Sequence, residues 1–186
     1  MEVLSTKENI LILIKEIKAQ NKSVGFVPTM GALHNGHLSL VRKALNENDE
    51  VIVSIFVNPT QFNKKEDLEK YPRDLECDIN LLKTLSNNNI IIYTPSINDI
   101  YGANIKALKF DFDGLENEME GKFRPGHFDG VGTVVKRLFE IVKPDSAYFG
   151  EKDFQQLQII KKLVEKFQLS VKVIGCEIYS EENGLA

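Results

Sequence analysis

The feature of this sequence that most constrains its fold is a series of short, almost continuously apolar segments. Residues 51–57 read Val-Ile-Val-Ser-Ile-Phe-Val and stop at Asn58-Pro59, and comparable runs occupy 24–27 and 90–93. β-Branched and aromatic residues favour strands, and proline disfavours helix at the residue that precedes it. Segments that are apolar on both faces are typical of a parallel sheet covered by helices on both sides.

Amphipathic stretches separate these runs and predict helices, because their apolar residues recur at spacings of three and four. The predicted helices cover 6–20, 36–46, 75–85, 128–142 and 154–167, and further strands are predicted at 108–110, 147–149 and 171–174. Strands that alternate with helices indicate a parallel sheet. The sequence therefore predicts one α/β domain over residues 1–186, with a Rossmann-like, doubly wound parallel sheet in three α/β/α layers.

Composition narrows the functional classes. The 186 residues carry a formal net charge of −4, whereas binding to nucleic acid or to a membrane surface generally needs a basic face, so we expect neither partner. No apolar run approaches the roughly 18 residues of a membrane helix, and we expect no signal peptide. Cys77 and Cys176 are far apart and lack the spacing of a metal site. We expect a cytoplasmic protein with reduced thiols.

The unusual residues of the sequence follow the predicted strands, which is where ligands bind in open parallel sheets. The first cluster runs into the helix that begins near Gly36 and reads Pro28-Thr29-Met30-Gly31-Ala32-Leu33-His34-Asn35-Gly36-His37. The N–H groups at a helix N-terminus favour phosphate, glycines permit close approach, and histidines add donors that can be protonated near neutral pH. A turn with two surface histidines is the alternative interpretation.

The second cluster, Asn58-Pro59-Thr60-Gln61-Phe62, comes directly after the strand at 51–57. Carboxamides of Asn and Gln can bind the carboxylate and hydroxyl groups of a small acid without adding charge. The alternative interpretation is an Asn-Pro turn with polar neighbours that have no function.

The third cluster covers residues 148–156 and crosses from a strand into a helix. Lys152 can neutralise phosphate charge, Asp153 can accept hydrogen bonds from ribose hydroxyls, and Gln156 lies one helical turn beyond Lys152 on the same face. The alternative is a solvated helix start, because acidic residues near a helix N-terminus are favourable in any case.

Together these clusters carry a family resemblance. The His34-x-x-His37 spacing resembles the HxGH motif of adenylyl-transferring enzymes with a dinucleotide-type fold. The chain from about Val24 to Ala186 is more specifically similar to pantothenate synthetases, which carry PTMGxLHxGH, SIFVNPxQF, YPR, RPGHF and FGEKDxQQ. The corresponding blocks here, in the same order, are residues 28–37, 54–62, 71–73, 124–128 and 149–156. The resemblance implies a sheet of the HxGH nucleotidyltransferase type.

The resemblance also implies roles for individual residues. His37, His34 and Lys152 are the implied catalytic residues, with His37 as proton donor. The implied ATP-binding residues are Met30, Gly31, Ala32, Leu33, His34, Asn35, Gly36, His37, Gly150, Glu151, Lys152, Asp153 and Tyr179. Gln61 and Gln156 are implied to bind pantoate, with Gln61 also beside β-alanine. Candidates of second rank are Pro28, Asn58, Arg124 and His127, although the last two could simply shape a turn. Asp78 is a candidate helper for Mg²⁺ beside the phosphates.

The implied activity is the ATP-dependent condensation of pantoate with β-alanine to give pantothenate. Pantoate attacks the α-phosphate of ATP to form pantoyl adenylate and pyrophosphate, and the amine of β-alanine then releases AMP. The resemblance implies ATP with Mg²⁺ as cofactor and a homodimer. Two alternatives remain: an HxGH adenylyltransferase of another pathway, and a non-catalytic nucleotide-binding or dimerisation module.

The chain also departs from the family pattern. It stops before the Ser-Ser-Arg motif and the smaller C-terminal lid domain, so residues 1–186 are expected to form only the N-terminal domain that binds ATP and pantoate. Ser180 stands where the family commonly has arginine, and Asn183 where it commonly has aspartate. We therefore expect a fragment that binds its ligands but turns over poorly.

Overall fold

The computed structural model of the protein describes residues 1–180 and 184. Its strands are β1 (Glu2–Leu4), β2 (Val24–Thr29), β3 (Glu50–Ile55), β4 (Ile90–Tyr93), β5 (Ser146–Gly150) and β6 (Lys172–Cys176). Its α-helices are α1 (Lys7–Ala19), α2 (Asn35–Glu47), α3 (Lys65–Lys70), α4 (Leu75–Lys83), α5 (Ile97–Tyr101), α6 (Met119–Phe123), α7 (His127–Val142) and α8 (Phe154–Phe167). Three 3₁₀ turns are η1 (Pro59–Gln61), η2 (Leu115–Asn117) and η3 (Glu151–Asp153).

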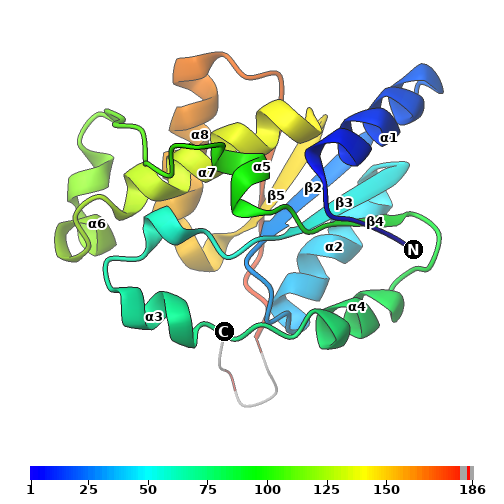
Figure 1. Ribbon diagram of the computed structural model, residues 1–186, viewed down its shortest axis with the longest axis horizontal. Helices are drawn as coiled ribbons and strands as arrows, with labels where there is room; N and C mark the ends of the chain where they lie inside the picture. The colour runs from blue at the N-terminus through cyan, green and yellow to red at the C-terminus, as the bar shows by residue number, and fades with distance from the viewer. Residues whose placement is uncertain (181–183, 185–186) are drawn as a thin grey trace.

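The described strands form one parallel sheet in the order β1-β4-β3-β2-β5-β6. The chain therefore leaves β2 toward β3 and β4 on one side, and later returns to the other side of β2 as β5 (Figure 1). This reversal of strand order confirms the predicted doubly wound sheet, and it opens a crevice at the carboxyl ends of β2 and β5.

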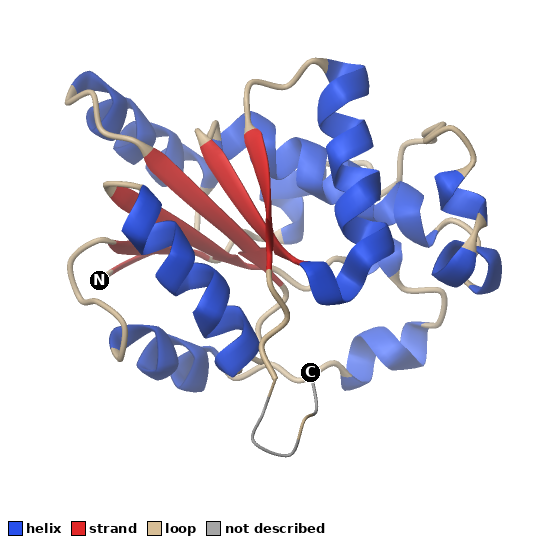
Figure 2. Ribbon diagram, turned by 180° about the vertical axis from the view of Figure 1, so that it is seen from behind, coloured by secondary structure: helices blue, strands red, loops and turns tan. Residues whose placement is uncertain are grey.

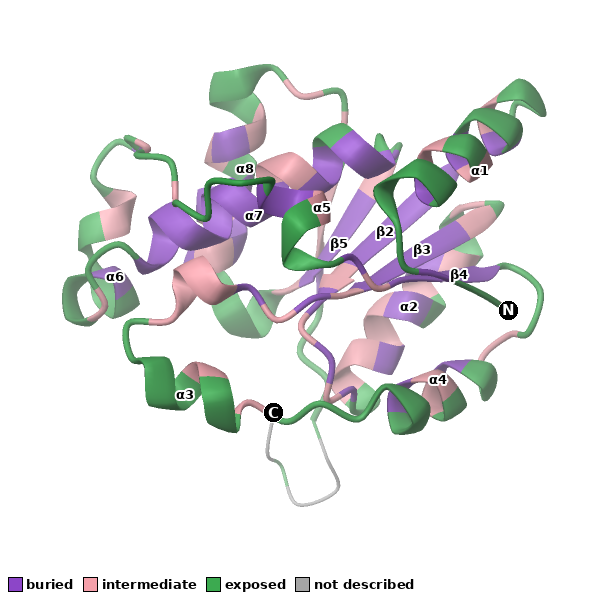
Figure 3. Ribbon diagram, in the orientation of Figure 1, coloured by how far each residue is buried: buried purple, intermediate pink, exposed green. Residues whose placement is uncertain are grey.

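Helices cover both faces of the sheet, as Figures 1 and 2 show from opposite sides. Successive residues of β3 enter different cores: Ile52 packs with α1, α7 and α8, whereas Val51 and Val53 pack with α2 and α4. The central strands are accordingly buried along most of their length (Figure 3). Full burial of one such aliphatic side chain stabilises a fold by about 1.5–3 kcal/mol, so the two cores fix the positions of the strand ends.

Sequence reasoning was wrong at 108–110, where we expected a strand. The backbone N–H of Leu108 donates to Thr133 Oγ1 at 2.8 Å, and that of Phe110 donates to Asp129 Oδ1 at 3.0 Å. Side chains of α7 thus satisfy the donors that a neighbouring strand would otherwise take. The segment lies against α7 outside the sheet and has no regular secondary structure.

Four short elements, β1, α3, α5 and α6, were not expected from the sequence, because each is too short to show a clear period. For α5 a local signal did exist. Ser96 and Asp99 form a reciprocal capping box, in which Ser96 Oγ accepts from the Asp99 N–H and Asp99 Oδ2 accepts from the Ser96 N–H. None of the helices in the described part of the chain is long and apolar enough to cross a membrane.

A close approach between α7 and η1 joins the helix layer to the loop that follows β3. A Cβ added at Gly130 would lie 2.4 Å from the carbonyl oxygen of Thr60 and 2.7 Å from Cα of Gln61. Only glycine fits there, because backbone atoms cannot move aside as a flexible side chain can. The approach brings Gln61 to the edge of the crevice.

We predict that Gly130→Ala lowers the free energy of unfolding by about 1–3 kcal/mol, because the new methyl group must displace backbone of η1. Gly132→Ala, in the same helix, is the matched control. Its added Cβ would meet the rings of Phe110 and Phe112 at 3.0–3.2 Å, and these are side-chain atoms rather than backbone. Urea denaturation measures both variants, and equal stability for the two would contradict this account of η1.

Candidate active site

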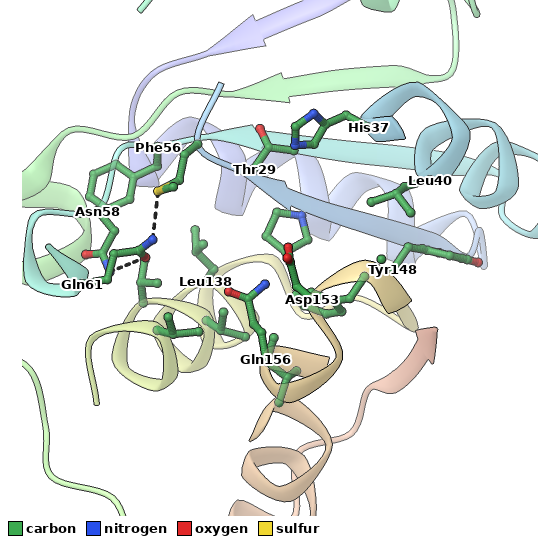
Figure 4. Close-up of a pocket in the computed structure, with 18 of the residues that line it drawn as sticks. Thr29, His37, Leu40, Phe56, Asn58, Gln61, Leu138, Tyr148, Asp153 and Gln156 are labelled. Carbon is green, nitrogen blue, oxygen red and sulfur yellow. Dashed lines mark hydrogen bonds between the residues drawn. The ribbon is translucent and has the colours of Figure 1, made fainter. Parts of the chain in front are cut away.

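A cavity of about 300 Å³ lies at the carboxyl ends of β2, β3 and β5 (Figure 4). All three predicted clusters contribute to it, through His34 and His37, Gln61, and Asp153 and Gln156. The residues that line it are Pro28, Thr29, Met30, His34, His37, Leu40, Phe56, Asn58, Gln61, Tyr71, Val131, Val134, Val135, Leu138, Tyr148, Phe149, Gly150, Asp153, Gln156 and Ile160. Segments that are far apart in the sequence therefore meet in one place.

The two histidines stand at the start of α2. His34 is the N-cap, and its Nδ1 accepts a hydrogen bond from the Gly36 N–H at 3.1 Å, so this nitrogen carries no proton in this geometry. The ring centroids of His34 and His37 are 4.2 Å apart. A Cβ at Gly36 would lie 2.9 Å from Cε1 of His34, and the glycine therefore leaves room for the cap.

His37 is held neutral in the ligand-free protein. Burial, then the neighbouring His34 and the charge of Lys152, lower the pKa of His37 to about 4. For His37, this corrects the expectation that the imidazole could be protonated near neutral pH. Its Nδ1 is buried and has no hydrogen-bond partner among the described residues. An anionic ligand near the ring would raise this pKa, because opposite charge favours the imidazolium.

Asp78 fixes the loop between β2 and α2. This side chain is 2% exposed, and its two oxygens accept from the N–H of Ala32 at 3.1 Å and the N–H of Leu33 at 2.7 Å. Gly31 has φ +82°, and a Cβ there would lie 2.9 Å from Asp78 Oδ2. The carboxylate is therefore a structural acceptor that shapes the loop.

The role of Asp78 as a helper for Mg²⁺ stays a prediction. In this structure each of its two oxygens accepts one backbone hydrogen bond and keeps a second lone pair. The described residues contain no group of three or more His, Cys, Asp or Glu side chains that could hold a metal ion.

The amides of Asn58 and Gln61 have fixed orientations. Asn58 is 1% exposed, and its Nδ2 donates to Gln61 Oε1 at 3.0 Å and to the Gly130 carbonyl at 3.1 Å. The Gln61 Nε2 is consequently left to face the cavity, where it contacts Met30 Sδ at 3.0 Å. A thioether is a weak acceptor, so an oxygen of a ligand can replace it with a gain in hydrogen-bond strength.

Arg124 and His127 lie behind the cavity wall and do not line it. The carbonyl oxygen of Gln61 accepts from His127 Nδ1 at 2.9 Å and from Arg124 Nη2 at 3.3 Å. Arg124 also pairs with Glu120. Burial lowers the pKa of His127, and its bond to the Gln61 carbonyl acts in the opposite direction. These two residues therefore hold the backbone of Gln61 in place, in addition to any part they have in shaping the local turn.

The two adjacent glutamines of the third cluster differ in role. Gln155 is buried; its Oε1 accepts from the Glu120 N–H, and its Nε2 donates to the carbonyls of Leu115 and Glu118. Gln155 therefore ties α8 to η2 and α6. Gln156, the next residue, lines the cavity opposite Gln61 (Figure 4).

Several predicted residues lie outside the cavity lining. They are Gly31, Ala32, Leu33, Asn35, Gly36, Asp78, Arg124, His127, Glu151, Lys152 and Tyr179. Lys152 is exposed but close enough for its charge to lower the pKa of His37. Tyr179 is exposed beyond the end of β6. Asn183 falls outside the described residues.

Comparison with known proteins assigns this chain to a family. The family model described as pantoate-beta-alanine ligase matches residues 2–186. The chain belongs to the pantoate–β-alanine ligase family. It is 58% identical to the pantothenate synthetase of Christiangramia forsetii and 56% identical to that of Flavobacterium psychrophilum, with all of this chain covered in both comparisons. It covers 65% and 66% of those two proteins, and thus spans just under two thirds of their length.

Solved structures of the family have the same fold. A pantothenate synthetase from Thermus thermophilus superposes with a TM-score of 0.90 at 42% identity, covering 100% of this chain and 65% of that one. A pantoate-beta-alanine ligase from Francisella tularensis, complexed with beta-gamma ATP and beta-alanine, gives a TM-score of 0.92 at 45% identity. That comparison covers 100% of this chain and 70% of the other.

The apolar wall of this ligase-family cavity was missed by sequence reasoning. Its members come mainly from α7 and comprise Leu40, Phe56, Val131, Val134, Val135, Leu138 and Ile160. In the sequence their helical spacing is the pattern of a core helix, and α7 does bury most of its length. No local signal separates the residues that face the cavity from those that face the sheet.

We predict that His37 titrates well below the usual range for histidine. Its folded-state pKa of about 4 lies below the ordinary value of 6.5, so its contribution to stability is complete above pH 6.5 and is lost as the pH falls toward 4. Heteronuclear NMR of the imidazoles measures the titration, and comparison with His37→Gln identifies the signal. A His37 pKa at or above 6.5 would contradict the burial described here.

Proposed function

We propose that this chain is the ATP- and pantoate-binding domain of an enzyme that condenses pantoate with β-alanine through pantoyl adenylate. The observation that carries the proposal is the meeting of His37, Gln61 and Gln156 on one cavity with an apolar wall. The proposed products are pantothenate, AMP and pyrophosphate. This reaction belongs to the biosynthesis of coenzyme A, and we place it in the cytoplasm.

The cavity suits a small hydroxy-acid with a branched apolar centre. Pantoate has a carboxylate, two hydroxyl groups and a carbon that bears two methyl groups. Gln61 and Gln156 supply neutral amide groups for the oxygens, while Val134 and Leu138 of α7 offer apolar surface to the methyl groups. None of the described lining residues is a lysine or an arginine. Neutral amides do not neutralise the carboxylate as a lysine or arginine would, so its oxygen remains a nucleophile.

The nucleotide is proposed to lie beside the start of α2. The positive partial charge at the N-terminus of α2 favours phosphate, and Lys152 adds a positive charge nearby. The neutral imidazole of His37 can donate a hydrogen bond, and it can take up a proton as the phosphate raises its pKa. His34 is proposed to face the phosphates together with His37. We assign the backbone of 30–33, Asn35, Gly150, Glu151 and Asp153 to the rest of ATP, and the backbone of Tyr179 to the adenine.

The proposed chemistry has two steps. An oxygen of the pantoate carboxylate attacks the α-phosphorus of ATP, and pyrophosphate leaves with the electron pair of the broken P–O bond. The nitrogen of β-alanine then attacks the activated acyl carbon, loses a proton, and displaces AMP. Both steps join separate reactants, so fixing them in one cavity can contribute up to roughly 7–11 kcal/mol to lowering the barrier. Donors aimed at the phosphate oxygens stabilise the charge that develops there.

ATP is proposed to act with Mg²⁺, which is generally bound mainly through phosphate oxygens and water. Asp78 is kept as the candidate helper for this ion, although its two oxygens also accept hydrogen bonds from the N–H groups of Ala32 and Leu33. We propose no binding of nucleic acid or membranes.

A homodimer is also proposed. Helix α6 exposes two large apolar side chains, Met119 at 63% and Phe123 at 81%, and a second copy of the chain could cover them. Sedimentation equilibrium distinguishes the dimer from the monomer.

We predict that Gln156→Ala weakens pantoate binding about tenfold or more, because the acid loses an amide partner. Gln158→Ala is the matched control, since Gln158 lies on the same helix but does not line the cavity. Isothermal titration calorimetry with pantoate measures both variants. Equal affinities, or binding of a mononucleotide in preference to pantoate, would contradict the proposed substrate.

For residues 1–186 assayed by themselves we predict a low turnover, because about a third of each relative's length has no counterpart in them. A coupled assay of AMP release with ATP, pantoate and β-alanine measures it. Turnover at the rate of a full-length relative, assayed in parallel, would contradict this expectation.

A further inference from the structure

We propose that Tyr101 is a positioning residue for the acid site, acting through Asn58 to hold the Gln61 amide with Nε2 toward the ligand. Tyr101 is the last residue of α5 and does not line the cavity. The inference rests on the proposed function in one respect, the assignment of Gln61 to pantoate. Its structural part, the control of amide orientation, is independent of any substrate.

Tyr101 makes the shortest hydrogen bond to Asn58. Its hydroxyl donates to Asn58 Oδ1 at 2.5 Å, whereas the Thr60 hydroxyl and the Thr60 N–H reach the same oxygen at 3.2 and 3.4 Å. The bond is buried, so it competes with no bulk water. An amide can occupy two orientations that differ by a flip, and a strong donor at one end selects the orientation with oxygen there.

The orientation of Asn58 determines that of Gln61. With Oδ1 toward Tyr101, Nδ2 points the other way and donates to Gln61 Oε1 and to the carbonyl of Gly130. Both protons of Nδ2 are thereby used, so Asn58 has no side-chain donor left for a substrate. Gln61 must then present Nε2 to the cavity. A flipped Gln61 would turn Oε1 toward a carboxylate, and two acceptors repel one another.

Tyr101 is itself fixed from the far side of the site. The Arg137 guanidinium lies over its ring at 4.6 Å from the centroid and donates to the Ile100 carbonyl at 2.6 Å. Tyr101 is 5% exposed, and burial raises the pKa of its hydroxyl, which therefore remains a protonated donor at neutral pH. The hydroxyl is thus held on Asn58 by α5 and α7 together.

The test compares two buried tyrosines in the chain as it exists. Tyr101→Phe removes the hydroxyl that contacts Asn58, and Tyr93→Phe removes a buried hydroxyl that has no hydrogen-bond partner among the described residues. Side-chain amide signals of Asn58 and Gln61 are recorded by ¹⁵N NMR without ligand, with Asn58→Asp and Gln61→Glu to assign them. Calorimetry measures pantoate affinity, and thermal unfolding confirms that each variant folds.

The expected result is a shift of both amide signals and a loss of about fivefold to tenfold in pantoate affinity for Tyr101→Phe, with neither change for Tyr93→Phe. Unchanged amide signals in a folded Tyr101→Phe variant would overturn the positioning role. If the amide signals shifted but pantoate affinity did not change, the proposal that Tyr101 positions Gln61 for acid binding would also be overturned. Failure of the proposed function shows separately, as absence of pantoate binding by the unsubstituted chain.

Discussion

The reversal of strand order at β2 is the constraint on which the rest of this structure depends. Parallel hydrogen bonding sets the carboxyl ends of β2, β3 and β5 at one edge, and the reversal separates the helices that leave them. The start of α2, the turn η1 and the start of α8 then face one cavity. Neither the histidines nor the glutamines could meet in a sheet that continued in one direction.

A second layer of buried groups holds the residues that face the cavity. Asp78 shapes the loop before His34, His127 holds the backbone of Gln61, and Gln155 anchors the helix that carries Gln156. These side chains form hydrogen bonds with other groups of the protein and do not face the cavity. They therefore fix the positions of the residues that do. Rigid placement of this kind lowers the reorganisation that the proposed reaction would otherwise require.

The sequence predicted the central strands well because buried parallel strands leave a strong signal, namely short runs that are almost continuously apolar. It also predicted that His37, Gln61 and Gln156 share a site, since each follows a strand. It could not predict the role of Asp78, whose partners are backbone groups 45 and 46 residues away. The choice of Gln156 over Gln155 depended on the family resemblance, because rotation by one residue along α8 decides which side chain faces the cavity. The segment 108–110 reads as a strand, yet Thr133 and Asp129 satisfy its backbone.

A crystal structure of this chain with pantoate and a non-hydrolysable ATP analogue tests the central claim most directly. The account predicts a pantoate oxygen on Nε2 of Gln61, in the place where Met30 Sδ now lies, with the α-phosphate between that acid and the imidazole of His37. Pantoate bound outside the crevice between β2 and β5, or a nucleotide whose phosphates lie away from the start of α2, would contradict it.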